Sequence, residues 1–194
     1  MKKKAKKKKD KRRRKKKSNR FLLFFFVLVV FLTLVFLIEL FGVEKEPTTL
    51  AVNMSKEQRE GIFFETILFR YPAEVLVIKQ KNLTKLNIGV SSDTDRFNFG
   101  RIILNVTPVV TKFLSVPNNG KRPVKVKIAS YGNISRFIKL SENDMIVKPG
   151  ENPEIRVVLN ITGNKTSTGY YTGEVDINIK VPKYDFLIPA LYAS

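Results

Sequence analysis

The sequence predicts an all-β protein, an antiparallel β-sandwich of about seven strands that is preceded by one transmembrane α-helix. Two observations lead to this prediction. Residues 21–38 are one long apolar run, and from residue 86 onward apolar and polar residues alternate in short segments separated by turn residues. The chain of 194 residues is long enough for one such domain with its attachments.

The first 20 residues are a basic tail. Residues 1–20 hold 15 of the 36 Lys and Arg residues against a single acidic residue, Asp10, so they carry +14 of the formal charge of +19. The rest of the chain is close to neutral, and the high charge is therefore no sign of a nucleic-acid-binding domain. We expect a disordered cytoplasmic tail that lies against anionic lipid, with no specific nucleic acid as partner.

Residues 21–43 are predicted to be an uncleaved signal-anchor helix. The run from Phe21 to Ile38 is broken only by Thr33 and spans ~27 Å, close to the ~30 Å of the hydrocarbon core. Thr33 is tolerated because its hydroxyl can donate to a carbonyl oxygen one turn back. A cleaved signal peptide would have a shorter apolar region that ends in small residues. Because the side rich in Lys and Arg stays in the cytoplasm, residues 44–194 are predicted to lie outside the cell membrane.

Glycosylation motifs provide an independent argument for this sidedness. Six Asn-x-Ser/Thr motifs occur where about 1.5 are expected by chance, and every one of them follows the apolar run. The charge rule and the motif count use different residues, so their agreement strengthens both. We predict N-glycosylation at Asn53, Asn82, Asn105, Asn133, Asn160 and Asn164.

Residues 44–83 are predicted to be a juxtamembrane stalk and a leading strand. Residues 56–71 fit either secondary structure. Ser55 with Gln58 would form a helix capping box, but the stretch is also rich in Phe and Ile, as strands are. The sequence leaves this choice open, whereas residues 73–80 are more typical of a strand.

Residues 84–182 are predicted to form the sandwich. Residues 124–128 and 155–161 alternate between apolar and polar side chains, which is the period of a strand with one buried face. In the last strand Val175, Ile177, Ile179 and Val181 share one face, and the other face holds four polar residues. These four polar residues are Glu174, Asp176, Asn178 and Lys180.

Residues 183–194 are largely apolar and are predicted to be a C-terminal tail or an edge strand.

Two aromatic pairs have the spacing of either core or contact residues. Phe97 and Phe99 are two residues apart and share a strand face, so we expect both in the core. Tyr170 and Tyr171 point to opposite faces, so the core can hold only one of them. The role of Tyr171 stays open at this point.

The segments DRFNFGRIIL, VPNNGKRPVKVKI, LSENDMIVKPGENPEIRVVLNI and GYYTGEVDINIKV together resemble an immunoglobulin-like module. The chain is similar to the PapD-like and ASPM-SPD-2-hydin-like sandwiches of archaeal and bacterial surface proteins. The shared motifs are the turn at Asn118–Gly120, the strand opening at Pro149–Glu151 and the strand entry at Gly169–Gly173. The resemblance covers about half of the chain. The resemblance implies a non-catalytic role in adhesion, spacing or assembly.

Catalytic chemistry finds little support in the residue types. The chain has no Cys and no His, which removes the commonest general base, the thiol nucleophile and most zinc sites. The acidic pairs Asp93 with Asp95 and Glu142 with Asp144 lack the spacing of a calcium loop. We therefore predict no catalytic residues, no cofactor and no metal.

The predicted function is a single-pass membrane protein that displays a glycosylated domain for protein–protein contact or envelope assembly. A partner strand could add to residues 176–181 or 186–191 if these form sheet edges. One alternative is a subunit of a pilus or archaellum filament, although Arg20 stands where its processing enzyme needs a small residue. A less favoured alternative is a membrane-anchored peptidase with Ser55 and Lys56 as a dyad.

Overall fold

The computed structural model describes residues 2–42, 46–79, 94–104, 109–161 and 167–193, and of residues 2–20 it describes only the backbone. The chain divides into two compact units, Met1–Gly42 and Val43–Ser194. Almost half of the residues whose side chains are described lie in strands, and all strands of the described residues belong to the second unit.

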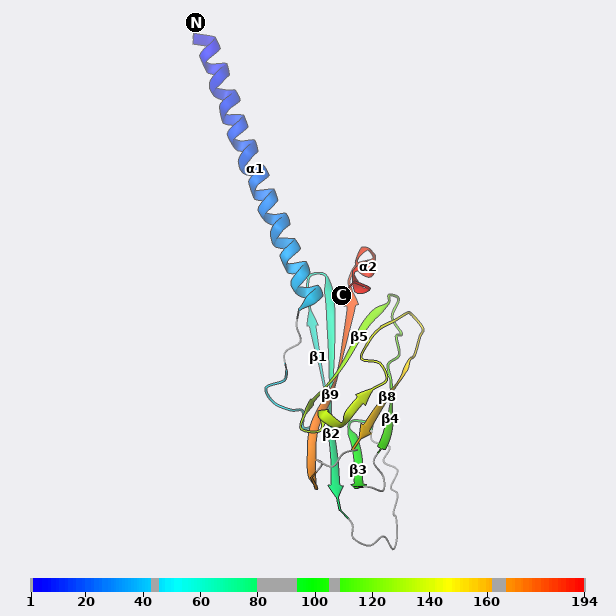
Figure 1. The fold of residues 1–194 in the computed structure, drawn as a ribbon. Coiled ribbons are helices and arrows are strands. Elements are labelled where there is room, and N and C mark those ends of the chain that lie inside the picture. The colour runs from blue at the N-terminus through cyan, green and yellow to red at the C-terminus, as the bar shows by residue number, and fades with distance from the viewer. Residues whose placement is uncertain (1, 43–45, 80–93, 105–108, 162–166, 194) are drawn as a thin grey trace. The chain divides into compact units, whose positions relative to one another are not determined.

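The first unit is the helix α1, Lys2–Phe41 (Figure 1). Its stretch Phe21–Phe41 is long and apolar enough to cross a membrane. The Thr33 hydroxyl donates to the carbonyl oxygen of Val29 at 2.9 Å, which confirms the expected bond one turn back. The basic residues continue the helix, where the sequence predicted disorder; Lys, Arg and Ala are good helix formers.

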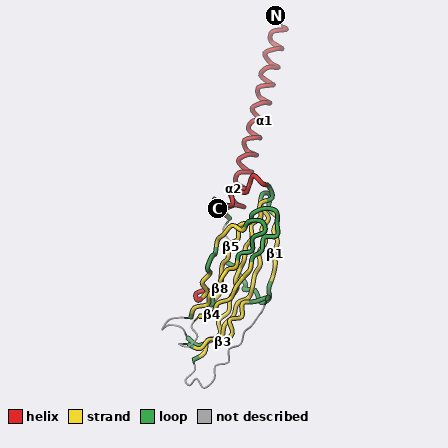
Figure 2. The backbone as a smooth tube through the Cα atoms, turned by 90° about the vertical axis from the view of Figure 1, so that its right-hand side faces the viewer, coloured by secondary structure: helices red, strands yellow, loops and turns green. Residues whose placement is uncertain are grey.

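The second unit holds two sheets (Figure 1, Figure 2). The larger sheet has the strand order β1–β2–β9–β5–β7, with β3 also beside β2; the smaller sheet has the order β4–β8–β6. The strands are β1 Ser55–Glu60, β2 Phe64–Ile78, β3 Phe97–Ile103, β4 Val109–Ser115, β5 Val124–Gly132, β6 Ile138–Leu140, β7 Asp144–Val147, β8 Glu154–Asn160 and β9 Gly169–Pro182. Short helical turns follow β5 (η1, Ser135–Phe137) and β9 (η2, Asp185–Leu187, and α2, Ile188–Leu191).

The two longest strands, β2 and β9, form the middle of the larger sheet. They pair antiparallel from Phe64 opposite Pro182 to Val77 opposite Gly169. On its other side β2 pairs with β1 over its first half and with β3 over its second half. The β2–β3 pair is parallel, so the predicted antiparallel order holds for both sheets except at this pair.

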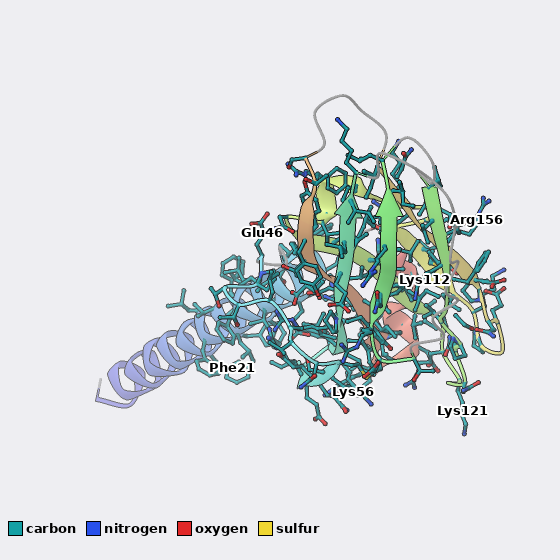
Figure 3. The ribbon with its side chains drawn as sticks, turned by 90° about the horizontal axis from the view of Figure 1, so that it is seen from below. Phe21, Glu46, Lys56, Lys112, Lys121 and Arg156 are labelled. Atoms are coloured by element: carbon teal, nitrogen blue, oxygen red, sulfur yellow. The ribbon has the colours of Figure 1, made fainter. Side chains whose placement is uncertain are left out.

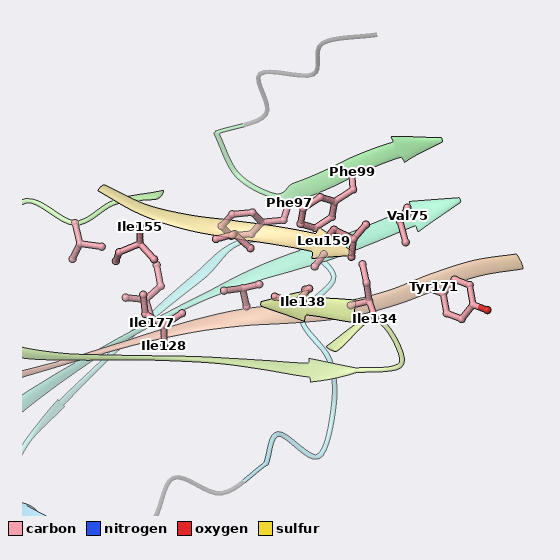
Figure 4. Close-up of a cluster of buried hydrophobic side chains, with 14 of the residues drawn as sticks. Val75, Phe97, Phe99, Ile128, Ile134, Ile138, Ile155, Leu159, Tyr171 and Ile177 are labelled. Atoms are coloured by element: carbon pink, nitrogen blue, oxygen red, sulfur yellow. The ribbon is translucent and has the colours of Figure 1, made fainter. Parts of the chain in front are cut away.

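The core lies between the inner faces of the two sheets (Figure 4). Val126, Val157 and Val175 are fully buried, which confirms the predicted apolar faces of residues 124–128, 155–161 and 175–181. Phe97 and Phe99 are also buried, as expected, and their rings stack with centroids 6.4 Å apart. Each sheet thus presents one apolar face, and burial of these faces is the main source of stability.

Residues 56–71 are strand rather than helix. They form β1 and the first half of β2, which pair with each other from Ser55 opposite Arg70 to Glu60 opposite Glu65. The helix that a capping box at Ser55 and Gln58 would begin is therefore not formed. Residues 44–83, predicted as a stalk and a leading strand, contribute the strands β1 and β2 to the larger sheet. The predicted start of the sandwich at residue 84 lies outside the described residues.

The C-terminal residues are not an edge strand. They form η2 and α2, with Leu187 and Leu191 buried. Pro189 lies in the first turn of α2, where its missing N–H costs no hydrogen bond. Elsewhere, charged side chains are distributed over several parts of the second unit, among them Lys56, Lys112, Lys121 and Arg156 (Figure 3).

Candidate functional site

The outer face of β9, which points away from the core, is partly covered rather than open to water. Glu174 is 0% exposed and Asp176 is 7% exposed, although both alternate with core residues as the sequence predicted. A carboxylate is buried at this depth only when it is paired and hydrogen-bonded, because its desolvation is costly. Partners from other segments must therefore meet these two side chains.

Arg70 of β2 is the first partner. Its Nη2 donates to both carboxylate oxygens of Glu174, at 2.8 and 2.9 Å, and its Nε lies 4.0 Å from Oδ1 of Asp176. The hydrogen bond to Glu174 raises the pKa of Arg70 above its ordinary value. Pairing of β2 with β9 sets Arg70 directly opposite Asp176, so the sheet register itself assembles this cluster.

The second partner is the chain that precedes β1, residues 46–54, which we term the covering segment. The backbone N–H of Ala51 donates to Oε2 of Glu174, and Nη2 of Arg70 donates to the carbonyl oxygen of Thr49 at 2.6 Å. Two backbone groups of the covering segment are thus bonded to the ion pair. The bonds attach this segment to the outer face of the larger sheet.

Two adjacent hollows lie on the same face and share Glu74. One, of about 290 Å³, lies between the covering segment and the ends of β2 and β9, with Arg96 at its side. The other, of about 230 Å³, lies between β2, β3 and Tyr170. Between them they are lined by Leu50, Ala51, Val52, Pro72, Ala73, Glu74, Val75, Leu76, Arg96, Asn98, Gly100, Arg101, Tyr170, Thr172 and Gly173.

Tyr170 is the most prominent side chain at these hollows. Its side chain is 57% exposed, and its hydroxyl donates to Oε2 of Glu74. This hydrogen bond raises the pKa of Tyr170 above its ordinary value. Arg96 and Arg101 lie at the same hollows, and Val52 is exposed nearby. We call Glu74, Arg96, Arg101 and Tyr170 with Val52 the Tyr170 surface.

One of the two adjacent tyrosines is exposed and the other is buried, as the alternation of strand faces predicted. Tyr171 is the buried one, and its hydroxyl donates to the carbonyl oxygen of Ser167 at 2.8 Å. Its ring packs edge-on against Phe137 with centroids 5.1 Å apart. This resolves the open role of Tyr171, which belongs to the core.

The predicted glycosylation sites lie partly within the described residues. Asn53 and Asn133 are exposed, in a bend and a turn, and Asn160 is half-buried as the last residue of β8. Oδ1 of Asn133 accepts the backbone N–H of Thr172 at 2.6 Å, which fixes the amide at the surface. The other three lie outside the described residues: Asn82, Asn105 and Asn164.

Neither of the two segments predicted to dock a partner strand lies at the edge of a sheet. Residues 176–181 belong to β9, which pairs with β2 on one side and with β5 on the other, and residues 186–191 are helical. Within the described part of the second unit, the outermost strands are β1, β3 and β7 in the larger sheet and β4 and β6 in the smaller. Strand order depends on pairing between distant segments, which alternation within one segment does not reveal.

The structure does not bring Ser55 and Lys56 together as a dyad. They are neighbours in β1, so their side chains point to opposite faces of the sheet. Nζ of Lys56 lies over the ring of Phe69, 5.6 Å from its centroid.

The acidic residues that could have bound calcium are paired with cations instead. Asp95 forms an ion pair with Arg96, and Asp144 forms one with Lys125, while Asp93 lies outside the described residues. Across the described ranges, no three His, Cys, Asp or Glu side chains cluster as metal ligands.

Sequence reasoning missed the Arg70 cluster and the Tyr170 surface. One signal was present for the cluster, because Arg70 is a single cation within the otherwise apolar run ILFRYPA. The Tyr170 surface had no such signal, since its residues come from three strands, the bend before β3 and the covering segment. Comparison with models of known protein families and with curated proteins finds no match for this chain.

Proposed function

We propose that this protein is a single-pass membrane protein with its amino end in the cytoplasm and its β-sandwich outside the cell. In this proposal the sandwich is non-catalytic and binds another protein, as a receptor or a component of envelope assembly. The apolar helix, the basic residues before it and the six glycosylation motifs after it support the membrane topology. The immunoglobulin-like relationship is part of the proposal and rests on the turn motifs.

The Tyr170 surface is the single observation that carries the binding function. Tyr and Arg are the residues that most often dominate the energy of protein–protein contacts, and this surface combines Tyr170 with Arg96 and Arg101 beside two hollows. Glu74 holds the Tyr170 hydroxyl, so the ring is already oriented before a partner binds. A partner with a carboxylate or carbonyl-rich loop would match the two guanidinium groups.

We expect glycans on the described acceptors of the intact protein. Asn53→Gln and Asn133→Gln should each remove one glycan and increase the mobility of the protein on a denaturing gel, because both side chains are exposed. Asn98→Gln is the control, because Asn98 lies outside any such motif. Protease added to intact cells should also digest residues 44–194. Full protection from this protease would contradict the proposed topology.

Tyr170→Ala should reduce the amount of cross-linked partner about ten-fold when intact cells are treated with a short cross-linker. Tyr170 lies at the surface, so the variant should fold and reach the membrane in normal amounts. Phe113→Ala is the matched control, since Phe113 is 60% exposed on β4 and lies away from the hollows. Equal loss of partner in both variants, or in neither, would contradict the assignment of this surface.

A further inference from the structure

Aromatic side chains gather at the end of the sandwich where β9 finishes. Phe186 is 72% exposed, and Tyr184 and Tyr192 are exposed as well, while Leu187 and Leu191 between them are buried. The rings of Tyr184 and Phe186 stack with centroids 5.5 Å apart. Nε of Arg122, just before β5, lies 2.5 Å from Oδ1 of Asp185 and attaches this segment to the sandwich, so the aromatic rings are held at its surface.

The turn between β1 and β2 lies at the same end. The backbone N–H of Lys183 donates to the carbonyl oxygen of Phe63 at 2.9 Å, and the neighbouring Ile62 is exposed. We call Ile62, Tyr184, Phe186 and Tyr192 the aromatic end. Its charges are paired, Lys183 with Glu60 at 3.8 Å and Arg122 with Asp185 at 2.5 Å, so it is apolar and close to neutral.

The described glycosylation motifs lie toward the opposite end of β9. Asn133 is bonded to Thr172, Asn160 ends β8 beside β6, and Asn53 adjoins Val52, which lines a hollow with Thr172. Thr172 is ten residues before Pro182, which corresponds to ~33 Å along the strand. Glycans are bulky and hydrophilic and stay in water, so an end that bears them faces away from a bilayer.

The chain before the sandwich keeps it close to the bilayer. Seven residues, 42–48, separate the apolar helix from Thr49, which Arg70 bonds, and even when fully extended they reach only ~25 Å. Arg70 is six residues from Phe64 at the aromatic end, or ~20 Å along β2. This chain length allows either end of the sandwich to reach the headgroup region, and the glycosylation motifs at the other end favour the aromatic end.

We propose that the aromatic end docks into the headgroup region of the bilayer that α1 spans, an inference that rests on the proposed membrane anchor and on the proposed glycosylation. Tyr and Phe favour this region because their rings leave water while the Tyr hydroxyl stays hydrated. The near-neutral charge fits contact with the interface itself rather than with a particular anionic headgroup. The Tyr170 surface then faces away from the bilayer.

A tryptophan reporter tests this docking directly, because the chain has no Trp. Phe186→Trp is made in the full-length protein and reconstituted in nanodiscs of phosphatidylcholine that carries a nitroxide on the headgroup. Its emission should fall about two-fold relative to unlabelled nanodiscs and should be blue-shifted. Phe113→Trp, at another well exposed ring on β4, is the control and should keep its emission.

A third variant separates this inference from the anchor. Phe31→Trp lies within the apolar stretch of α1 and should be quenched by phosphatidylcholine labelled in the acyl chain. If Phe31→Trp is quenched but Phe186→Trp responds no more than Phe113→Trp, the docking inference is wrong and the anchor stands. If Phe31→Trp is not quenched, the membrane anchor itself is wrong. Shielding of Phe186→Trp from aqueous iodide without quenching by lipid would mean that a protein covers the aromatic end, which also overturns the inference.

Discussion

Glu174→Ala is expected to lower the free energy of unfolding by about 3 kcal/mol. The change leaves the Arg70 guanidinium on a covered face without its main carboxylate, and it leaves the N–H of Ala51 without its acceptor. Both groups would have to regain water, which requires the covering segment to detach from the sheet. Urea denaturation of the full-length protein, followed by the strand signal in far-ultraviolet circular dichroism, measures the effect.

Glu57→Ala is the matched control for this change. Glu57 pairs with Arg59 at 2.9 Å, but both side chains are exposed, so the loss should stay below about 0.5 kcal/mol. The triple change Arg70→Met, Glu174→Gln and Asp176→Asn removes the three charges of the cluster and keeps an acceptor for Ala51, so it should recover at least half of the lost stability. The account of the cluster fails if Glu174→Ala is as mild as Glu57→Ala.

Gly173→Ala should destabilise the sandwich by about 3 kcal/mol or more, because the sheet has no space for a methyl group there. A Cβ at Gly173 would lie 2.1 Å from the carbonyl oxygen of Tyr131 and 2.6 Å from Cγ2 of Ile134. Since β9 is paired on both sides, the backbone cannot shift away without breaking one of two ladders. Thermal unfolding of the full-length variant measures the loss.

Gly150→Ala provides the comparison for Gly173→Ala. Gly150 has a φ of 79°, which disfavours alanine, but nothing lies within 4 Å of the added Cβ. Its substitution should therefore cost only about 1 kcal/mol, which is the backbone effect alone. Equal losses at the two positions would show that conformational preference, and not the close approach of β5 and β9, requires Gly173.

Local alternation predicted the faces of individual strands well. The pattern of VKVKI at residues 124–128 and of EVDINIKV at residues 174–181 depends only on neighbouring residues, and the core confirms it. Residues 56–71 were ambiguous because their apolar positions fit both a period of 3.6 and a strand rich in Phe and Ile. Pairing of these residues with the distant β9 decides for strand, and no local pattern contains that information.

The environment of the polar faces could not be predicted in the same way. Glu174 alternates with Val175 as a solvent-facing residue would, but Ala51, 123 residues earlier in the chain, covers it. Likewise Asp176–Val181 has the composition of an edge strand and lies between two long strands. Burial of polar residues and strand order are both properties of long-range contacts, and so the Arg70 cluster and the Tyr170 surface emerge only from the folded chain.

The long pairing of β2 with β9 has a mechanical consequence. If the aromatic end is held at the bilayer and the Tyr170 surface holds a partner, a pulling force runs parallel to these two strands. Tyr170 lies at the start of β9 and the aromatic end follows its last residue, so the covalent backbone of β9 carries this load. The hydrogen bonds of the ladder with β2, from Phe64 opposite Pro182 to Val77 opposite Gly169, lie perpendicular to the pull and are not loaded directly. A force across the strands would instead open the same ladder one pair at a time. The sandwich is therefore expected to resist tension best along the axis that joins the membrane to its partner.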